Sequence, residues 1–213
     1  MKSNPHNITK DFEKALCEYT GSRYAVAVTS CTMALLLACR WAAGTGAYEP
    51  TASAVGARLY GITIPSRTYV SVPQSIIHAG FKVGFEDYEW SGMYQLEPLP
   101  VWDSARRFTS SMYVEGQFQC VSFHSSKILA DTQGGAILHD NDEADAWFRR
   151  ARFDGRTEGV APKDDTFDMV GWHAYMSPDV AARLLFKLSV LPKHNHDLPN
   201  DEYPDLSLVE AFR

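Results

Sequence analysis

The sequence has no long hydrophobic run and few cysteines, and each shortage excludes classes of protein. No apolar stretch reaches the roughly 20 residues of a membrane-spanning helix. The polar opening Met-Lys-Ser-Asn-Pro-His-Asn also lacks the apolar core of a signal peptide. The four cysteines, Cys17, Cys31, Cys39 and Cys120, form no CxxC pair and no metal-ligand spacing. We therefore expect a cytoplasmic protein with reduced thiols, no metal site and no membrane partner.

An excess of positive charge is also missing. The 26 acidic residues outnumber the 20 basic ones, and the formal net charge of −6 argues against a broad binder of nucleic-acid backbones. His194 and His196 lie in a polar tail that we interpret as a solvated loop rather than a metal site. One cluster of cations is interpreted as a solvated helix end that complements the helix dipole: Arg149, Arg150, Arg152 and Arg156.

The chain of 213 residues, 45% of them hydrophobic, is long enough to bury a sizeable core. Apolar periodicity predicts helices over 11–19, 32–43 and 178–190. Short apolar runs predict strands over 24–29, 61–65, 82–86, 100–102, 118–123 and 136–139. Strands that alternate with helices indicate an α/β protein with a mainly parallel sheet. Ligands bind beyond the carboxyl ends of such strands, where we expect Ser30, Ser66, Asp103 and His124 to meet.

Lys127 is the first candidate for a catalytic residue. It follows a predicted strand and a small polar turn, and glycines and a second apolar strand come after it. An amine that attacks an aldehyde needs such an exposed and fixed position. Asp103 closes an earlier apolar strand. A pyridoxal phosphate (PLP) enzyme needs both, because the lysine holds the aldehyde and the carboxylate pairs with the pyridinium nitrogen. Either residue alone is weak evidence.

Other segments carry features that would suit a cofactor, each with an ordinary alternative. Ser30, Cys31 and Thr32 join a strand to a helix, where their N–H groups could bind an anion or simply cap the helix. Tyr69 is expected in the first turn of a helix, where its ring could stack on a flat heterocycle or pack against the protein. Ser122 could reach a phosphate or satisfy a neighbouring group.

Taken together, these segments resemble the DegT/StrS family of PLP-dependent sugar aminotransferases over about residues 11–188. Five motifs stand in the family's order. They are the opening helix, strand and phosphate loop (12–32), the segment with the ring-stacking aromatic (65–69), the cofactor clamp Asp103-Ser-Ala-Arg106, the Schiff-base segment Ser122-Phe-His-Ser-Ser-Lys127, and the following strand (134–138). The resemblance implies a three-layer α/β/α fold of the PLP-transferase type.

The resemblance also implies roles for individual residues. Lys127 would form the Schiff base and transfer protons, and Asp103 would keep the pyridinium protonated. Tyr69 would cover one ring face. The phosphate would be held by Ser30, Cys31, Thr32 and Ser122. The implied reaction transfers an amino group from an amino acid, with glutamate as the expected donor, to a keto-sugar that is expected to be nucleotide-linked. The family's site lies between subunits, so the resemblance implies a homodimer in which the segment around His173 reaches the partner's phosphate.

Several positions depart from the family pattern. Cys31 replaces the usual glycine of the phosphate loop, and Arg106 replaces a glutamine, bringing a cation that could stabilise the cofactor's phenolate or bind a substrate acid. His173 and Tyr175 replace the usual asparagine and arginine. The passage before Val101 and the part after residue 188 are both shortened. We therefore expect a compact PLP-binding domain over residues 1–155 and a reduced C-terminal region, with a dimer-contact loop and a helix, over residues 156–213.

Two other functions remain open from the sequence. The family's arginine binds the carboxylate of the amino donor, and Tyr175 replaces it here. This change could permit decarboxylation or another reaction at the α-carbon in place of transamination. A non-catalytic regulatory protein or scaffold could also have kept the fold and lost its substrate walls. Retention of both Lys127 and Asp103 argues against the last interpretation, because a purely structural residue at either position need not ionise.

Overall fold

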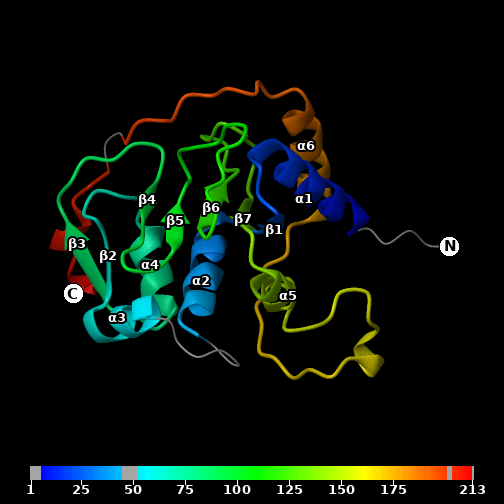
Figure 1. Cartoon of the computed structure of the whole chain (residues 1–213), viewed down its shortest axis with the longest axis horizontal. Coiled ribbons are helices and arrows are strands. Elements are labelled where there is room, and N and C mark those ends of the chain that lie inside the picture. The colour runs from blue at the N-terminus through cyan, green and yellow to red at the C-terminus, as the bar shows by residue number, and fades with distance from the viewer. Residues whose placement is uncertain (1–5, 45–51, 201–202, 213) are drawn as a thin grey trace.

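Strands and helices alternate in the N-terminal part of the computed structural model, and five strands follow without a helix between them over residues 83–139. The structure describes residues 6–44, 52–200 and 203–212. Figure 1 shows the arrangement. The α-helices are α1 Asn7–Thr20, α2 Cys31–Ala42, α3 Ala52–Tyr60, α4 Ser71–His78, α5 Asp142–Ala151 and α6 Pro178–Ser189. The strands are β1 Tyr24–Val28, β2 Ile62–Pro65, β3 Val83–Glu86, β4 Tyr94–Gln95, β5 Val101–Asp103, β6 Phe118–Ser122 and β7 Gly135–His139. Every helix and strand expected from the sequence is present, and α3 and β4 are additional.

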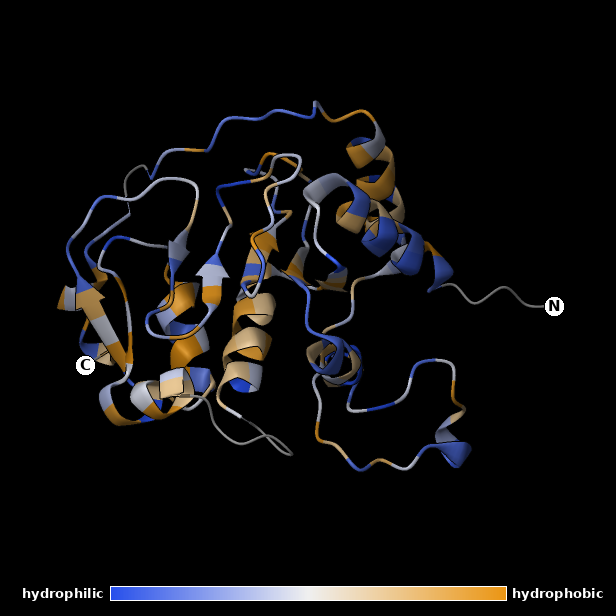
Figure 2. Cartoon of the chain, in the orientation of Figure 1, coloured by the Kyte–Doolittle hydropathy of each residue, from blue (hydrophilic) through white to orange (hydrophobic). Residues whose placement is uncertain are grey.

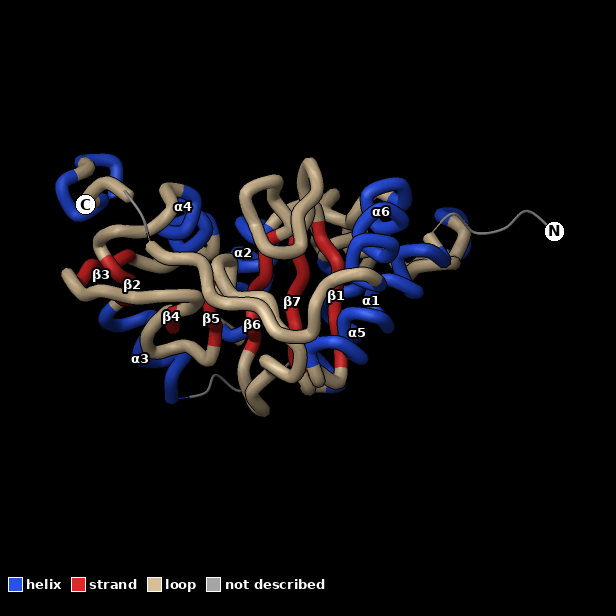
Figure 3. The backbone as a smooth tube through the Cα atoms, turned by 90° about the horizontal axis from the view of Figure 1, so that it is seen from above, coloured by secondary structure: helices blue, strands red, loops and turns tan. Residues whose placement is uncertain are grey.

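The sheet is mixed, which corrects the expectation of a mainly parallel one. Five strands follow the order β1-β7-β6-β5-β4, and only β5 and β6 pair in parallel. The parallel pair of β2 and β3 continues this row, because Thr63 and Glu97 exchange backbone hydrogen bonds of 2.9 and 3.1 Å. Figure 3 shows the strands side by side from β3 to β1. The connections before β5 and β7 hold no crossover helix, and both strands pair antiparallel with the strand before them.

Helices cover both faces of the sheet, which confirms the expected three-layer α/β/α class. In β1, Val26 and Val28 pack in the cluster formed with α2 and α5, whereas Ala25 and Ala27 pack in the cluster formed with α1 and α6. This alternation follows from the period of two residues in a strand. Figure 2 shows the hydrophobic colours gathered on strands and helices, and hydrophilic colours on most connecting segments. Both faces of the central strands are therefore buried.

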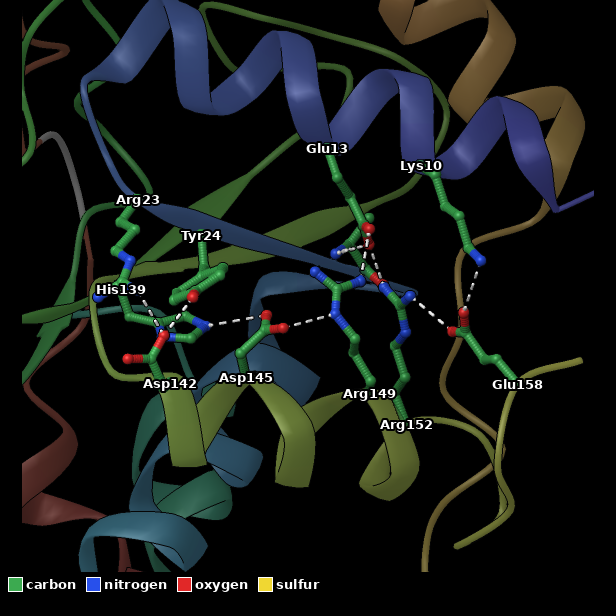
Figure 4. A network of polar contacts seen from close by, with 11 residues as sticks. Lys10, Glu13, Arg23, Tyr24, His139, Asp142, Asp145, Arg149, Arg152 and Glu158 are labelled. Carbon is green, nitrogen blue, oxygen red and sulfur yellow. Dashed lines mark hydrogen bonds and ion pairs between the residues drawn. The ribbon is translucent and has the colours of Figure 1, made fainter. Parts of the chain in front are cut away.

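A buried ionic network covers the outer edge of β1 (Figure 4). The Glu13 carboxylate of α1 accepts a hydrogen bond from Ala27 N at 2.9 Å, and Arg152 Nη1 donates to Ala27 O at 2.7 Å. Glu13 also pairs with Arg152 and with Arg149, at 2.8 Å from the latter. The two side chains thus satisfy backbone groups of an edge strand. Arg152 is only 2% exposed, so interpreting its cluster as a solvated helix end was wrong for this residue.

The tail after α6 is a loop in which His194 and His196 are exposed, as expected from its polarity, and hydrogen bonds also tie it to the rest of the fold. We call residues 191–200 the strap. Asn195 Nδ2 donates to Tyr19 Oη at 2.9 Å, and Asp197 accepts hydrogen bonds from Arg107 Nε at 2.9 Å and Arg107 Nη2 at 2.5 Å. Leu198 N donates to Arg106 O at 2.8 Å. In Figure 1 the strap runs in orange from α6 across the molecule toward β2 and β3, which brings the C-terminal residues beside the opposite end of the sheet.

Two further sequence expectations can be compared with the structure. All four cysteines are free thiols, as expected. Within the described ranges, no helix has both the length and the apolar character needed to cross a membrane.

Candidate active site

One cavity of about 510 Å³ opens at the sheet edge where β5 and β6 end and where β4 and β7 begin. Its volume lies within the usual range for small-molecule sites, about 300–1,000 Å³. The predicted site residues on its wall are Ser30, Cys31, Thr32, Tyr69, Asp103, Arg106, Ser122 and Lys127. His124 also lines the cavity, whereas Ser66, expected at the same edge, does not. Residues distant in the sequence therefore meet because their strands end together.

The N-terminus of α2 forms one side of the cavity. Ser30 is extended and its Oγ accepts a hydrogen bond from Met33 N at 3.2 Å, so the ordinary helix-cap interpretation is confirmed. Thr32 Oγ1 lies 2.7 Å from Ser71 Oγ, which places further hydroxyls beside this helix end. A Cβ at Gly135 would lie only 2.4 Å from Cys31 N, so glycine permits the start of β7 to approach α2. Hydroxyls and a helix N-terminus together suit an anion.

The Cys31 side chain is buried in the core. Its Sγ donates a hydrogen bond to Cys120 O at 3.4 Å, toward β6. Burial raises the pKa of this thiol well above its usual value, so the thiol stays neutral. A side chain larger than glycine is thus tolerated at this turn because it packs inward rather than against the anion position.

Asp103 lies at the floor of the cavity with only 4% of its surface exposed. Its Oδ1 accepts a hydrogen bond from Ala105 N at 2.9 Å, and its Oδ2 accepts one from Tyr94 Oη at 3.0 Å. Burial raises the pKa of this carboxyl, while the two hydrogen bonds and the nearby charges of Lys127 and Arg106 oppose that rise. A buried carboxylate of this kind is stabilised by a cation placed beside it.

Lys127 lies on a loop that is anchored to the rest of the fold. Its backbone N donates to His124 O at 2.9 Å. Further along the loop, the buried Asp131 donates its N–H to Phe123 O at 2.8 Å and its carboxylate pairs with Arg183 of α6 at 3.0 Å. The lysine is half-buried on the cavity wall. The structure therefore anchors the backbone of the loop that carries this amine at the cavity.

Aromatic side chains form the opposite wall. Trp90 and Tyr203 have nearly parallel rings, with an interplanar angle of 8° and centroids 6.5 Å apart, and Tyr69 lies edge-on to Tyr203 at 6.3 Å. Arg106 Nη2 donates to Tyr203 Oη at 3.2 Å, and its guanidinium lies over the Tyr203 ring. Tyr69 is 57% exposed and lies in the turn before α4, which begins at Ser71, rather than in the helix's first turn.

Besides Ser66, one further predicted residue lies outside the cavity, and several residues near the cavity were missed. His173 is exposed, pairs with Asp154 at 3.0 Å and does not line the cavity. Its expected role in a partner's site stays a prediction. The missed residues are Thr68, which lies in the 65–69 segment but was not singled out, Trp90 and Tyr203, which line the cavity, and Tyr94, which bonds Asp103. Their only signal in the sequence was an aromatic or hydroxyl side chain, which is too common to select them.

The residues at this cavity fit PLP. The cofactor carries an aldehyde, a basic ring nitrogen and a phosphate. The cavity offers an amine at Lys127, a buried carboxylate at Asp103, and hydroxyls with a helix N-terminus around Ser30. Across residues 6–44, 52–200 and 203–212, no group of three or more His, Cys, Asp or Glu side chains could hold a metal ion.

The three-layer α/β/α fold and this donor set are similar to those of PLP-dependent transferases. The chain belongs to the DegT/DnrJ/EryC1/StrS aminotransferase family, whose model matches residues 3–103 and 103–197. Members of this family use PLP.

Solved structures share the fold. AtS13 from Actinomadura melliaura is 17% identical with a TM-score of 0.71, and the alignment covers 86% of this chain and 60% of that one. The sugar aminotransferase CalS13 from Micromonospora echinospora is 15% identical with a TM-score of 0.69, covering 86% and 60%. Helicobacter pylori PseC, an aminotransferase involved in the biosynthesis of pseudoaminic acid, is 16% identical with a TM-score of 0.67, covering 90% and 59%. The chain thus spans about 60% of their length. No curated protein matches the sequence.

Proposed function

We propose that the protein is a PLP-dependent aminotransferase that moves an amino group from glutamate to a keto-sugar carried on a nucleotide. The observation that supports this most strongly is the meeting of Lys127 and the buried Asp103 in one cavity beside the N-terminus of α2. A lysine or a carboxylate alone would be commonplace. The glutamate donor and the nucleotide-linked acceptor come from the family resemblance, since the solved relatives include a sugar aminotransferase.

The cavity residues have separate proposed roles in holding the cofactor. The hydroxyls of Ser30, Thr32 and Ser122, with backbone N–H groups at Cys31, bind the phosphate. Tyr69 covers one face of the ring. Asp103 pairs with the ring nitrogen and favours its protonated form, and Lys127 holds the aldehyde carbon.

When bound, PLP supplies an electron sink that stabilises negative charge on the α-carbon of an amino acid. Lys127 would do the proton transfers. Its amine would be placed to accept the proton from the donor's α-carbon. The anchored loop keeps this amine near the cavity, because Asp131 and Arg183 fix the segment that follows it. Arg106 brings a permanent cation to the cavity, where it would stabilise the phenolic oxygen or bind a substrate acid.

The active protein is proposed to be a homodimer. His173 is exposed, outside the cavity of its own chain, and on the segment that resembles the family's contact to the partner's phosphate. We retain the division into a PLP-binding domain, 1–155, and a reduced C-terminal region, 156–213, as part of this proposal. In that division, Tyr203, which follows the strap, lines the cavity.

A direct test is to mix the purified protein with PLP and record its visible absorbance before and after borohydride reduction. We expect a visible band, and after reduction a PLP adduct mapped by mass spectrometry to Lys127. Lys127→Ala should lose the adduct. Lys163→Ala is the matched control, because this exposed lysine lies outside the cavity, and it should keep the adduct. A wild-type protein with no band and no adduct would overturn the proposal.

Incubation with glutamate then separates transamination from the alternatives. Release of one 2-oxoglutarate per bound PLP, without carbon dioxide, is the expected result. Carbon dioxide release would instead identify decarboxylation. A protein that binds PLP but changes neither glutamate nor any of several other amino acids would fit the non-catalytic interpretation.

A further inference from the structure

The carboxylate at the floor of the cavity is held by a directional chain of hydrogen bonds. Tyr94 Oη lies 3.0 Å from Asp103 Oδ2 and 2.5 Å from Thr68 Oγ1. A carboxylate has only acceptor atoms, so the single hydroxyl hydrogen of Tyr94 points to Asp103. Thr68 must then donate to the Tyr94 oxygen. The order of donation is therefore Thr68 to Tyr94 to Asp103.

Strand direction is what places Tyr94 at this point. Tyr94 begins β4, Asp103 ends β5, and the two residues are direct partners in the antiparallel register. Directly opposed residues in such a pair project to the same face, so both side chains reach the same place below the cavity. A parallel β4 would begin at the far edge of the sheet and could not supply this hydroxyl there.

The surroundings of Asp103 make this hydrogen bond important. Asp103, Tyr94 and Thr68 are 4%, 3% and 1% exposed, so water contributes little to any of them. The other titratable or charged groups that act on Asp103 are Lys127, Arg106, Cys31 and Cys120. Both thiols stay neutral because burial raises their pKa values. Tyr94 is also held neutral, since burial and the Asp103 charge raise the pKa of its hydroxyl well above the usual value.

We propose that Tyr94 is a positioning residue that fixes the Asp103 carboxylate in its ionised form and aims it at the ring nitrogen of PLP. Oδ1 is oriented by Ala105 N and Oδ2 by Tyr94, so the carboxylate plane is fixed from both sides. Each oxygen keeps a lone pair for the cavity. Thr68 supports the arrangement by orienting the tyrosine hydroxyl. This inference concerns Asp103 itself and rests on the proposed function only for the identity of the ring that it faces.

The test is the substitution Tyr94→Phe, which removes the hydroxyl and keeps the ring. The protein is first studied without PLP, with carbon-13 labels on its aspartate carboxyls. The NMR signal that is absent in Asp103→Asn belongs to Asp103, and its dependence on pH gives the titration midpoint of that carboxyl. We expect the midpoint to rise by about one pH unit, on the scale of one hydrogen bond to a charged group. Thr68→Val should shift it the same way by less. Tyr24→Phe is the matched control, because the Tyr24 hydroxyl bonds Asp142 outside the cavity, and it should leave the midpoint unchanged.

A second readout is the dissociation constant for PLP, measured by absorbance titration. Tyr94→Phe should weaken binding about tenfold, corresponding to about 1.4 kcal/mol. An unchanged Asp103 midpoint in a folded Tyr94→Phe protein would refute the positioning role. If Tyr94→Phe does not fold, an unchanged midpoint in Thr68→Val would refute it equally. If the midpoint rises but the wild-type protein binds no PLP, the role of Tyr94 toward Asp103 stands and the proposed function fails.

Discussion

Replacing Glu13 by glutamine tests how the edge strand β1 is held, and with it the position of Ser30 at the end of that strand. Glu13 is buried and accepts hydrogen bonds from Ala27 N, Arg149 and Arg152. Removing one partner of a buried ion pair costs about 3–5 kcal/mol. Arg152 keeps Glu158 at 2.8 Å and Arg149 keeps Asp145 at 2.8 Å, so we expect the lower end, about 3 kcal/mol.

Urea denaturation followed by circular dichroism gives this free energy of unfolding. In a thermal scan, a loss of about 3 kcal/mol in a chain of this size lowers Tm by roughly 6–12 °C. Glu18→Gln on the same helix is the matched control. The Glu18 side chain is 67% exposed and lies 3.8 Å from Lys14, so its removal should cost less than about 0.5 kcal/mol.

The effect of Glu13→Gln should also depend on pH. Burial alone would raise the pKa of Glu13, but the charges of Arg152 and Arg149 outweigh it and the pKa is lowered. A carboxyl with a lowered folded-state pKa stabilises the protein above its unfolded value, about 4.3, and this contribution is lost as the pH falls further. The stability gap between wild type and variant should therefore narrow in acid. A gap below about 1 kcal/mol at neutral pH, or one that widens in acid, would refute the reasoning.

Three further predictions concern the cavity. Gly135→Ala should weaken PLP binding and lower Tm, because its Cβ would lie 2.4 Å from Cys31 N; an unchanged dissociation constant in an absorbance titration would contradict this close approach. Cys31→Ser should change that constant by less than about threefold, since the Cys31 side chain packs toward the core, and a larger change would mean that it faces the anion instead. Asp131→Asn should lower the rate of 2-oxoglutarate release more than it weakens PLP binding, because it loosens the loop behind Lys127, and equal losses in both would indicate a general collapse of the cavity. In the proposed homodimer, inactive Lys127→Ala and His173→Ala proteins should regain activity when mixed and refolded together, whereas no recovery would argue that each chain uses only its own residues.

Local patterns in the sequence were sufficient for the fold class and for much of the cavity. Asp103 ends a strand, Lys127 and Ser30 each follow one, and a short apolar run followed by a polar turn can be recognised without knowing its neighbours. The ends of β1, β5 and β6 then bring these residues together, because these three strands run in the same direction. The family resemblance added the expected cofactor, since it depends on the order of motifs rather than on contacts.

Long-range contacts settled the remainder. β4 has only two residues, and its antiparallel pairing places Tyr94 against Asp103, a contact that no spacing in the chain reveals. Arg152 looked like a solvated cation, yet it is buried because Glu13, far away in the sequence, neutralises it. Tyr203 reaches the cavity only because the strap crosses the molecule. Residue type and periodicity specify which elements form, whereas the direction of each strand and the partner of each buried charge depend on contacts between distant segments.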